Sequence, residues 1–359
     1  MRILIVSDAW YPQINGVVRT LSTVAGELRQ LGHDVSVIGP DRFRTIPCPT
    51  YPDIRLAIDA FCKLPRLMRA FQPDAIHIST EGPLGLAARR YCRQNGLAFT
   101  TAYHTKFPEY IQARTRIPPS WTYMPMRWFH AAAAQVMVST GSIEAELRRN
   151  GFGNIVRWSR GVDTSLFRPR DKSFLPDPRP IALYVGRVAV EKNIAAFLDL
   201  PFAGTKYVVG DGPQLRLLRR RYPGVRFVGM KTGEDLANHY AASDVFVFPS
   251  RTDTFGLVLL EALASGIPVA AYPVAGPLDV IGDAPVGCLD EDLAAAVTKA
   301  LTLRPEACRA HALNFSWRAS AEQFLRNLVP AARSAAFPAP DMMADMATVA
   351  TADPSRPMS

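Results

Sequence analysis

Two carboxylates, Asp253 and Glu261, flank the start of a predicted helix in the second half of the sequence. With a rise of roughly 1.5 Å per residue, Glu261 lies about 12 Å along the helix axis from Asp253. If the helix begins near Thr254, its first backbone amides have no acceptor inside the helix and can bind a phosphate group. These amides belong to four successive residues, Phe255, Gly256, Leu257 and Val258.

This spacing fits the three parts of a nucleotide sugar. Carboxylates are good acceptors for neighbouring hydroxyl groups. Asp253 is therefore suited to the sugar, the helix amides to the diphosphate and Glu261 to the ribose. A capping aspartate and a glutamate on the helix surface are the alternative interpretation of the same residues.

Two cations follow the first predicted strand of the second half. Arg187 and Lys192 lie on either side of the turn that leads from this strand into a helix. Fixed positive charges there would stabilise a diphosphate leaving group, whose negative charge grows as the bond to the sugar breaks. An exposed basic pair is the alternative. The glycine-rich segment 209–213 is typical of a ligand loop, which is a weak signal on its own.

In the first half, a long loop follows the first predicted strand and enters a helix at Gly16. The loop lacks the G-x-G-x-x-G spacing of a dinucleotide site, which counts against an NAD-dependent enzyme. Gly16 would allow a phosphate to approach backbone amides, although an ordinary turn glycine explains it equally well. His104 follows a later strand, and we expect it at a ligand cleft rather than in a purely structural role.

Short apolar runs alternate with amphipathic helical stretches along both halves of the chain. The predicted strands are 2–7, 34–38, 74–79, 98–103 and 135–139 in the first half, and 181–185, 206–209, 225–228, 244–248 and 267–271 in the second. This alternation predicts an α/β fold with parallel sheets and crossover helices. Ligands bind beyond the carboxyl ends of such strands, where the candidate residues fall.

The sequence predicts two doubly wound, Rossmann-like domains, 1–165 and 175–314. Their predicted linker, at about 165–180, is rich in proline and continues neither period. Residues 334–359 are rich in Ala, Pro, Asp, Met and Thr without periodicity, and we predict that they are disordered.

Positive charge is concentrated in the first half. Up to Arg170 there are 22 Lys and Arg residues against 12 Asp and Glu, and beyond it 19 against 20, so net charges of +10 and −1 make up the total of +9. A basic domain suggests an anionic partner, either a phospholipid surface or a nucleic acid. A solvated basic face is the alternative.

Metal and disulfide chemistry are not indicated by the sequence. The five cysteines are odd in number, scattered and never spaced as C-x-x-C. There is no convincing cluster of metal ligands, and we expect no metal or other cofactor. No apolar run of about 18 residues occurs, and the N-terminal apolar run is too short for a signal peptide, so we expect a cytoplasmic protein.

Together these motifs resemble glycosyltransferase family 4, whose members are retaining enzymes with the GT-B fold. The resemblance rests on the run D-T-F-G-L-V-L-L-E-A-L-A-S-G-I-P-V from Asp253 and the spacing G-R-x4-K from Gly186. It extends over nearly the whole chain, through the segments 15–17, 103–105, 160–163 and 315–317.

The resemblance implies that Arg187 and Lys192 bind the donor diphosphate, Glu261 the ribose, and the amides of residues 255–258 the phosphate and sugar. It places His104 near the transferred sugar. It also implies a metal-independent, front-face reaction, in which the departing phosphate helps to take the acceptor proton. A last helix, near 315–333, would cross back to complete the first domain. The expected donor is a UDP- or GDP-sugar. The family's usual pattern has Glu where this sequence has Asp253, which leaves the identity of the donor sugar undetermined.

The segment 114–130 interleaves arginines with Trp, Tyr, Phe and Met, which is typical of a membrane interface. A well-packed helix with surface arginines would give the same pattern. The pattern also resembles the glycolipid-forming branch of the family. We therefore expect a lipid acceptor, such as diacylglycerol or a glycolipid, and a peripheral location on the inner face of the plasma membrane. The alternatives are a soluble or polysaccharide acceptor, an epimerase or phosphorylase of the same fold, and a non-catalytic nucleic-acid-binding protein. We expect no nucleic-acid partner.

Overall fold

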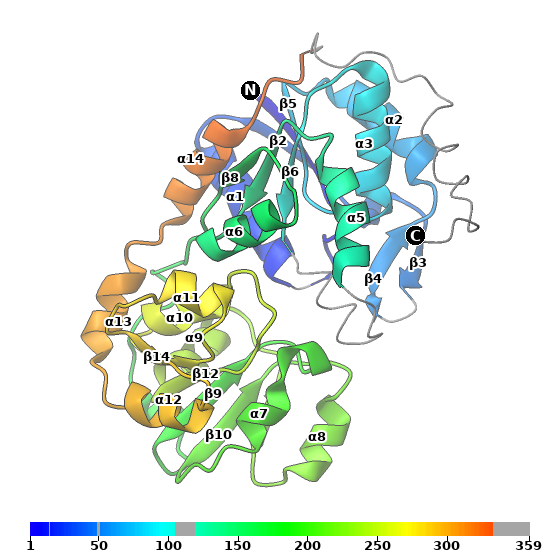
Figure 1. The fold of residues 1–359 in the computed structure, drawn as a ribbon. Helices are drawn as coiled ribbons and strands as arrows, with labels where there is room; N and C mark the ends of the chain where they lie inside the picture. Colours follow the sequence, from blue (N-terminus) through cyan, green and yellow to red (C-terminus); the bar gives the residue numbers. More distant parts are fainter. Residues whose placement is uncertain (14, 49–50, 105–118, 333–359) are drawn as a thin grey trace, which may run out of the picture.

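The computed structural model describes residues 1–13, 15–48, 51–104 and 119–332. These residues form two α/β domains, which are drawn one above the other in Figure 1. The predicted disordered tail, 334–359, and the first part of the aromatic segment, 114–118, lie outside the described residues. None of the described helices is both long enough and apolar enough to cross a membrane.

The first domain is built on a six-stranded parallel sheet. Its strands, in spatial order, are β2 (Asp34–Ile38), β1 (Arg2–Val6), β5 (Ala75–Ile78), β6 (Thr100–Tyr103), β7 (Gln135–Val138) and β8 (Ile155–Arg157). The helices of this domain include α1 (Gly16–Gln30), α2 (Ala60–Phe71), α3 (Pro83–Asn95), α5 (Pro119–His130) and α6 (Gly141–Arg149). An antiparallel hairpin separates β2 from α2 and consists of β3 (Thr45–Cys48) and β4 (Tyr51–Ala57).

Both faces of this sheet are buried, as its continuous apolar strands require. Successive residues of β1 point to opposite sides. Leu4 packs with Leu64 of α2, whereas Ile3 lies in a separate cluster with Phe324. Phe324 belongs to α14 (Trp317–Asn327), which lies beside α1 in Figure 1. The last described helix therefore completes the core of the first domain, as expected.

The second domain repeats this design with another six-stranded parallel sheet. Its strands, in spatial order, are β11 (Arg226–Gly229), β10 (Thr205–Val209), β9 (Ile181–Val185), β12 (Val245–Phe248), β13 (Val269–Ala271) and β14 (Gly287–Leu289). Its helices include α7 (Ile194–Leu198), α8 (Leu215–Arg221), α9 (Gly233–Ala241), α10 (Leu257–Ala264), α11 (Ala275–Val280), α12 (Leu293–Ala300) and α13 (Pro305–Ala312).

The fold class is confirmed: two doubly wound parallel sheets, each with helices on both faces. The ten predicted strands all exist, with ends that differ by at most two residues. The sequence missed the hairpin strands β3 and β4, and it also missed β8 and β14, which are three residues long and lie at the ends of their sheets. Such short edge strands carry too little periodicity to be recognised.

Candidate active site

The loop between β12 and α10 carries Asp253 and lies against the turn that follows β9. Thr252 Oγ1 donates to the carbonyl of Glu191 at 3.2 Å, and Asn193 Nδ2 donates to the carbonyl of Pro249 at 3.1 Å. Strands β9 and β12 are neighbours in the parallel sheet, so their carboxyl ends lie at one edge. This adjacency brings the predicted sugar-binding carboxylate close to the predicted diphosphate-binding cations.

Lys192 and Asp253 form an ion pair between Nζ and Oδ1. Both side chains are mostly buried, with 21% and 17% of their surface exposed. The second oxygen, Asp253 Oδ2, is shielded from solvent and accepts no hydrogen bond from the described residues. A buried acceptor of this kind requires a donor, and a sugar hydroxyl is one that a ligand would supply. Lys192 thus pairs with Asp253, the predicted sugar-binding carboxylate, and it is also a candidate for binding the diphosphate.

Arg251 could also have paired with Asp253, since it lies two residues earlier, but it has other partners. Its Nη2 atom lies 2.9 Å from Glu291 Oε2, and its guanidinium stacks over Tyr272 at 3.7 Å from the ring centre. The hydrogen bond and charge of Glu291 raise the pKa of Arg251. The alternative in which Asp253 orients Arg251 is therefore wrong for this structure.

Arg187 lies in the turn after β9, as the sequence predicts. The hydroxyl of Tyr184 donates to the carbonyl of Arg187 at 2.7 Å, which fixes the backbone where the strand ends. The short helical turn that follows contains Lys192, so both cations belong to one connection between β9 and α7. The part of this connection next to Lys192 is held against the Asp253 loop by the hydrogen bonds of Glu191 and Asn193.

The helix after Asp253 begins three residues later than expected. Helix α10 starts at Leu257, and Gly256 precedes it with φ of 82°. The amide of Leu259 already bonds to the carbonyl of Gly256 at 2.9 Å. Leu257 and Val258 therefore supply first-turn amides, whereas Phe255 and Gly256 belong to the loop. Their amides remain candidates for a phosphate, but not as part of the helix.

Glu261 lies one turn into α10 and is buried, with 3% of its surface exposed. Tyr240 Oη donates to Glu261 Oε2 at 2.9 Å, and Arg19 forms an ion pair with Oε1. Burial raises the pKa of Glu261, while Arg19 and the Tyr240 hydrogen bond act in the opposite direction. The carboxylate is held at a fixed position from both sides of the cleft, because Arg19 comes from α1 of the first domain.

Gly16 is the first residue of α1 and lies opposite the start of α10. A Cβ atom on Gly16 would lie 3.9 Å from Leu257 Cδ1, an ordinary contact, so close packing does not require glycine here. Asn15 caps the helix by accepting hydrogen bonds from Val17 N and Val18 N, each at 3.0 Å. Two of the amides that a phosphate could use are therefore already bonded to Asn15. The phosphate role of Gly16 remains a prediction.

His104 lies at the carboxyl end of β6, and its backbone contacts the loop between β12 and α10. Its carbonyl accepts a hydrogen bond from Thr254 Oγ1 at 2.8 Å. Its Nδ1 lies 3.4 Å from Arg160 Nη2, and its Nε2 is buried without a hydrogen-bond partner among the described residues. Burial, followed by the charge of Arg160, holds the pKa of His104 well below its usual value, so the ring is neutral near pH 7.

Two residues that the sequence analysis did not select help to build the site. Arg19 lies one turn after Gly16 on the same helix, a spacing that could have indicated it. Asp8, at the end of β1, accepts hydrogen bonds from Leu84 N at 2.9 Å and Gly85 N at 3.2 Å. Asp8 therefore caps α3 and fixes the loop before Gly16. No group of three or more His, Cys, Asp or Glu side chains in the described part of the chain is arranged to hold a metal ion.

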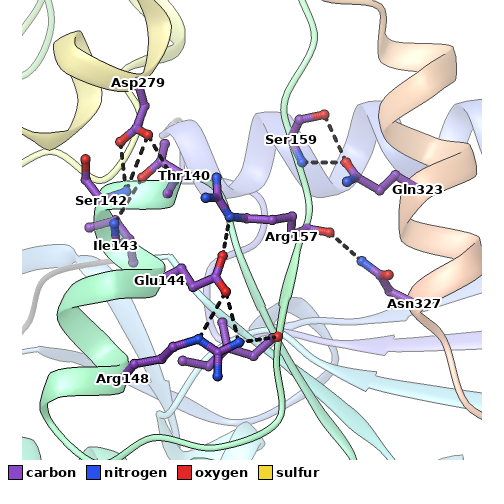
Figure 2. Close-up of polar contacts among 12 residues, drawn as sticks. Thr140, Ser142, Ile143, Glu144, Arg148, Arg157, Ser159, Asp279, Gln323 and Asn327 are labelled. Atoms are coloured by element: carbon purple, nitrogen blue, oxygen red, sulfur yellow. Dashed lines mark hydrogen bonds and ion pairs between the residues drawn. The ribbon is translucent and has the colours of Figure 1, made fainter. Parts of the chain in front are cut away.

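The two domains touch at the edge of this site. Figure 2 shows Asp279 of α11 directed at the first turn of α6, where its carboxylate accepts from Gly141 N at 3.0 Å and Ser142 N at 3.2 Å. Ser139 Oγ donates to the carbonyl of Thr254 at 3.2 Å. The loop between β12 and α10 and the first domain are thus connected by direct hydrogen bonds.

Two doubly wound domains that face each other across such a site define the GT-B fold. Residues 14–166 match the family model described as Glycosyltransferase Family 4, and residues 179–303 match Glycosyl transferases group 1. A sucrose-phosphate synthase from Thermosynechococcus elongatus has the same fold, with a TM-score of 0.73 and 24% identity over 90% of this chain and 97% of that one.

Curated relatives extend the match to nearly the whole chain. A GDP-mannose-dependent alpha-mannosyltransferase of Mycobacterium tuberculosis is 30% identical over 90% of this chain and 95% of the relative. An alpha-monoglucosyldiacylglycerol synthase of Streptococcus pneumoniae is 29% identical over 85% and 79%. The chain belongs to glycosyltransferase family 4 and is a hexosyltransferase with a nucleotide-sugar donor. This assignment decides against the non-catalytic nucleic-acid-binding alternative.

Proposed function

We propose that the protein transfers a hexose, with retention, from a GDP- or UDP-sugar to a membrane lipid. The proposal for the donor depends chiefly on the Lys192–Asp253 pair, because it presents a buried carboxylate oxygen that has no donor among the described residues. Glu261 lies in the helix that follows and is the proposed acceptor for the ribose hydroxyls. The mannosyltransferase relative makes GDP-mannose the first donor to test.

In this proposal, cationic side chains of the protein neutralise the negative charge of the leaving group. Arg187 and Lys192 stabilise the diphosphate as its bond to the sugar breaks. His104 is neutral, so it acts beside the sugar as a hydrogen-bond partner rather than as an acid. The departing phosphate, not a protein side chain, takes the acceptor proton. We propose that no metal takes part.

Helix α5 supports a lipid acceptor because it leaves an apolar face uncovered. Trp121, Met124 and Trp128 have 74%, 64% and 52% of their surface exposed. They are spaced by three and four residues and therefore lie along one side of the helix. Arg127 is also exposed, so the surface combines aromatic side chains with positive charge. This combination suits an anionic membrane interface better than bulk water.

Contacts with α3 hold Trp128 of this face in place. The guanidinium of Arg89, on α3, lies 3.8 Å from the Trp128 ring centre. Arg89 also donates to the carbonyls of Trp128 and Phe129 at the end of α5. Burial lowers the pKa of Arg89 to about 10, so it stays charged near neutral pH. The exposed indole is therefore fixed on the surface by contacts to the domain.

A transfer assay tests the proposed reaction. Purified protein is incubated with labelled GDP-mannose or UDP-glucose and anionic vesicles that contain diacylglycerol, with and without EDTA. We expect label in the organic phase with one of the donors, an α-linked product by NMR, and a rate that EDTA does not change. Label that reaches only soluble or polysaccharide acceptors would reject the lipid, and loss of the rate in EDTA would reject the metal-free reaction.

Flotation with anionic vesicles tests the membrane surface separately. The variant Trp121→Ala/Met124→Ala should lose most of its vesicle binding, because it removes apolar area from the exposed face. Leu217→Ala is the matched control, since Leu217 is 64% exposed on α8 of the second domain. Equal flotation of the wild type and the α5 variant would reject α5 as the membrane contact.

A further inference from the structure

Arg19 reaches from the first domain to a buried carboxylate of the second. Its Nη1 atom pairs with Glu261 Oε1, and its guanidinium lies 5.4 Å above the ring centre of Phe167, which belongs to the predicted linker. The Arg19 side chain is 40% exposed, whereas that of Glu261 is 4% exposed. This ion pair exists only when the two domains lie as close as they do here, because its partners belong to different domains.

The Glu261 carboxylate keeps unused acceptor positions while Arg19 remains bound. Arg19 contacts Oε1 and Tyr240 contacts Oε2. An ionised carboxylate offers about four acceptor positions, so each oxygen can accept a second hydrogen bond. A cavity of about 10 Å³ beside the pair, close to the volume that one water molecule needs, is lined by Arg19, Asp163, Leu257 and Glu261. A single hydroxyl-sized group can therefore approach Glu261 without displacing Arg19.

The charges around Glu261 give Arg19 a specific task. Burial favours the neutral acid, and Arg19 from α1 and Tyr240 from α9 oppose this effect. Asp163, just before the linker, also faces Arg19; burial raises its pKa, but hydrogen bonds from Ser165 and Leu166, with a smaller effect of Arg19, lower its pKa overall. From α13, Arg309 donates at 2.7–2.9 Å to backbone carbonyls rather than to Glu261. Within the part of the chain that the structure describes, Arg19 is thus the cation in contact with the Glu261 carboxylate.

We propose that Arg19 is a positioning residue of the donor site, which keeps Glu261 ionised and oriented for the ribose when the cleft is closed. The proposal rests on the proposed role of Glu261 as the ribose acceptor. An ionised carboxylate accepts hydrogen bonds from hydroxyls more strongly than a neutral acid does. Because Arg19 comes from the opposite domain, ribose binding and domain closure favour each other.

Nucleotide binding as a function of pH tests this role. The dissociation constants of GDP and UDP are measured by calorimetry from about pH 5.5 to about pH 8.5, a range that lies above the ordinary pKa of a glutamate. Removing the charge in Arg19→Gln raises the pKa of Glu261, so binding should weaken at a higher pH than in the wild type. As the pH falls, the dissociation constant of Arg19→Gln should come to exceed that of the wild type by about tenfold for each unit by which the pKa of Glu261 rises. Arg19→Lys should restore the wild-type profile in large part.

The Glu261→Gln background separates a charge effect from a structural one. Without a titratable group at position 261, adding Arg19→Gln should change nucleotide affinity by the same factor at every pH. A pH-independent loss in Arg19→Gln alone, or a shifted profile that persists with Glu261→Gln, would overturn the role proposed for Arg19. If the wild type binds neither nucleotide, the donor site is rejected as a whole, and Arg19 with it.

Discussion

The Lys192–Asp253 pair explains how an aspartate can serve where a longer glutamate is usual in the family. The side chain is one methylene shorter, yet Lys192 holds one oxygen and leaves the other for a ligand. A carboxylate anchored in this way has few orientations. If Asp253 binds the sugar as proposed, this geometry would select among donors by the position of a single hydroxyl, which makes the pair the proposed determinant of donor preference.

Removing either cation should slow transfer while leaving the fold intact. Arg187→Ala and Lys192→Ala each remove charge stabilisation from the leaving diphosphate, at a cost of roughly 3 kcal/mol or about a hundredfold in kcat/KM. Lys192→Ala also leaves Asp253 without its cation, so we expect it to change donor preference, unlike Arg187→Ala. Steady-state kinetics with several donors and a thermal melt measure both effects. Near-normal turnover in both variants would contradict the assignment.

Asp253→Asn keeps the shape of the side chain but removes its charge. If Oδ2 accepts directly from the sugar, the variant should lose about 1.5–3 kcal/mol of donor discrimination, and unevenly among donors that differ at one hydroxyl. Asp253→Glu adds a methylene to a closed site and should change the ranking of donors rather than improve every rate. A uniform loss across all donors would show that Asp253 does not contact the sugar.

Sequence reasoning located the residues whose neighbours along the chain form a motif. Asp253 and Lys192 were selected in this way, and the structure places them in contact. Their pairing was not predicted, because it depends on β9 and β12 being neighbours in space. Arg19 was missed for the same reason: its partner, Glu261, lies in the other domain.

At the level of elements, the start of α10 is determined by Gly256. Its φ of 82° lies in the left-handed region and turns the chain into the helix. The sequence placed the helix start near Thr254, because the apolar run is continuous from Phe255 onward and hides the turn. The loop between β12 and α10 is therefore longer, and Asp253 lies farther from the helix than a capping residue would.

Gly256→Ala should destabilise the second domain and weaken donor binding. Alanine would have to adopt the left-handed conformation of Gly256, which costs about 1–2 kcal/mol. Its Cβ atom would lie 3.1 Å from Leu259 Cδ1. Urea unfolding measures the loss. Gly224→Ala is the control, because a Cβ atom there would meet nothing within 4 Å and its φ is not left-handed. Equal stability of the two variants would show that Gly256 is not under conformational constraint.

At the level of the whole molecule, contacts between the domains hold the cleft in the arrangement described here. The sequence predicted two domains but not these contacts, since Asp279 and Gly141 are 138 residues apart. On the other side, α14 fastens to the first domain through Gln323 Oε1, which accepts from Ser159 N at 2.7 Å, and both residues are labelled in Figure 2. The α14 contact lies within the first domain, whereas the Asp279 contact must break when the cleft opens.

Asp279→Ala should therefore favour an open cleft without unfolding either domain. The carboxylate bonds to two amides at the start of α6, a favourable position for negative charge, worth about 0.3–1 kcal/mol at an exposed site. By that estimate we expect the donor KM to rise about two- to fivefold with little change in kcat. The radius of gyration by small-angle X-ray scattering should also increase in the nucleotide-free protein and return toward the wild-type value with nucleotide.

Asp283→Ala is the matched control for Asp279→Ala, because Asp283 is an exposed carboxylate four residues further along the chain. It removes the same charge, so a general effect of net charge on donor attraction would appear equally in both variants. Asp279→Asn should be intermediate, since its amide oxygen can still accept from α6 but carries no full charge. If Asp279→Ala and Asp279→Asn match the wild type in radius of gyration and KM, as the Asp283→Ala control should, the Asp279 contact does not hold the cleft closed. Closure would then depend on other contacts between the domains, such as those of Thr254 and Arg19.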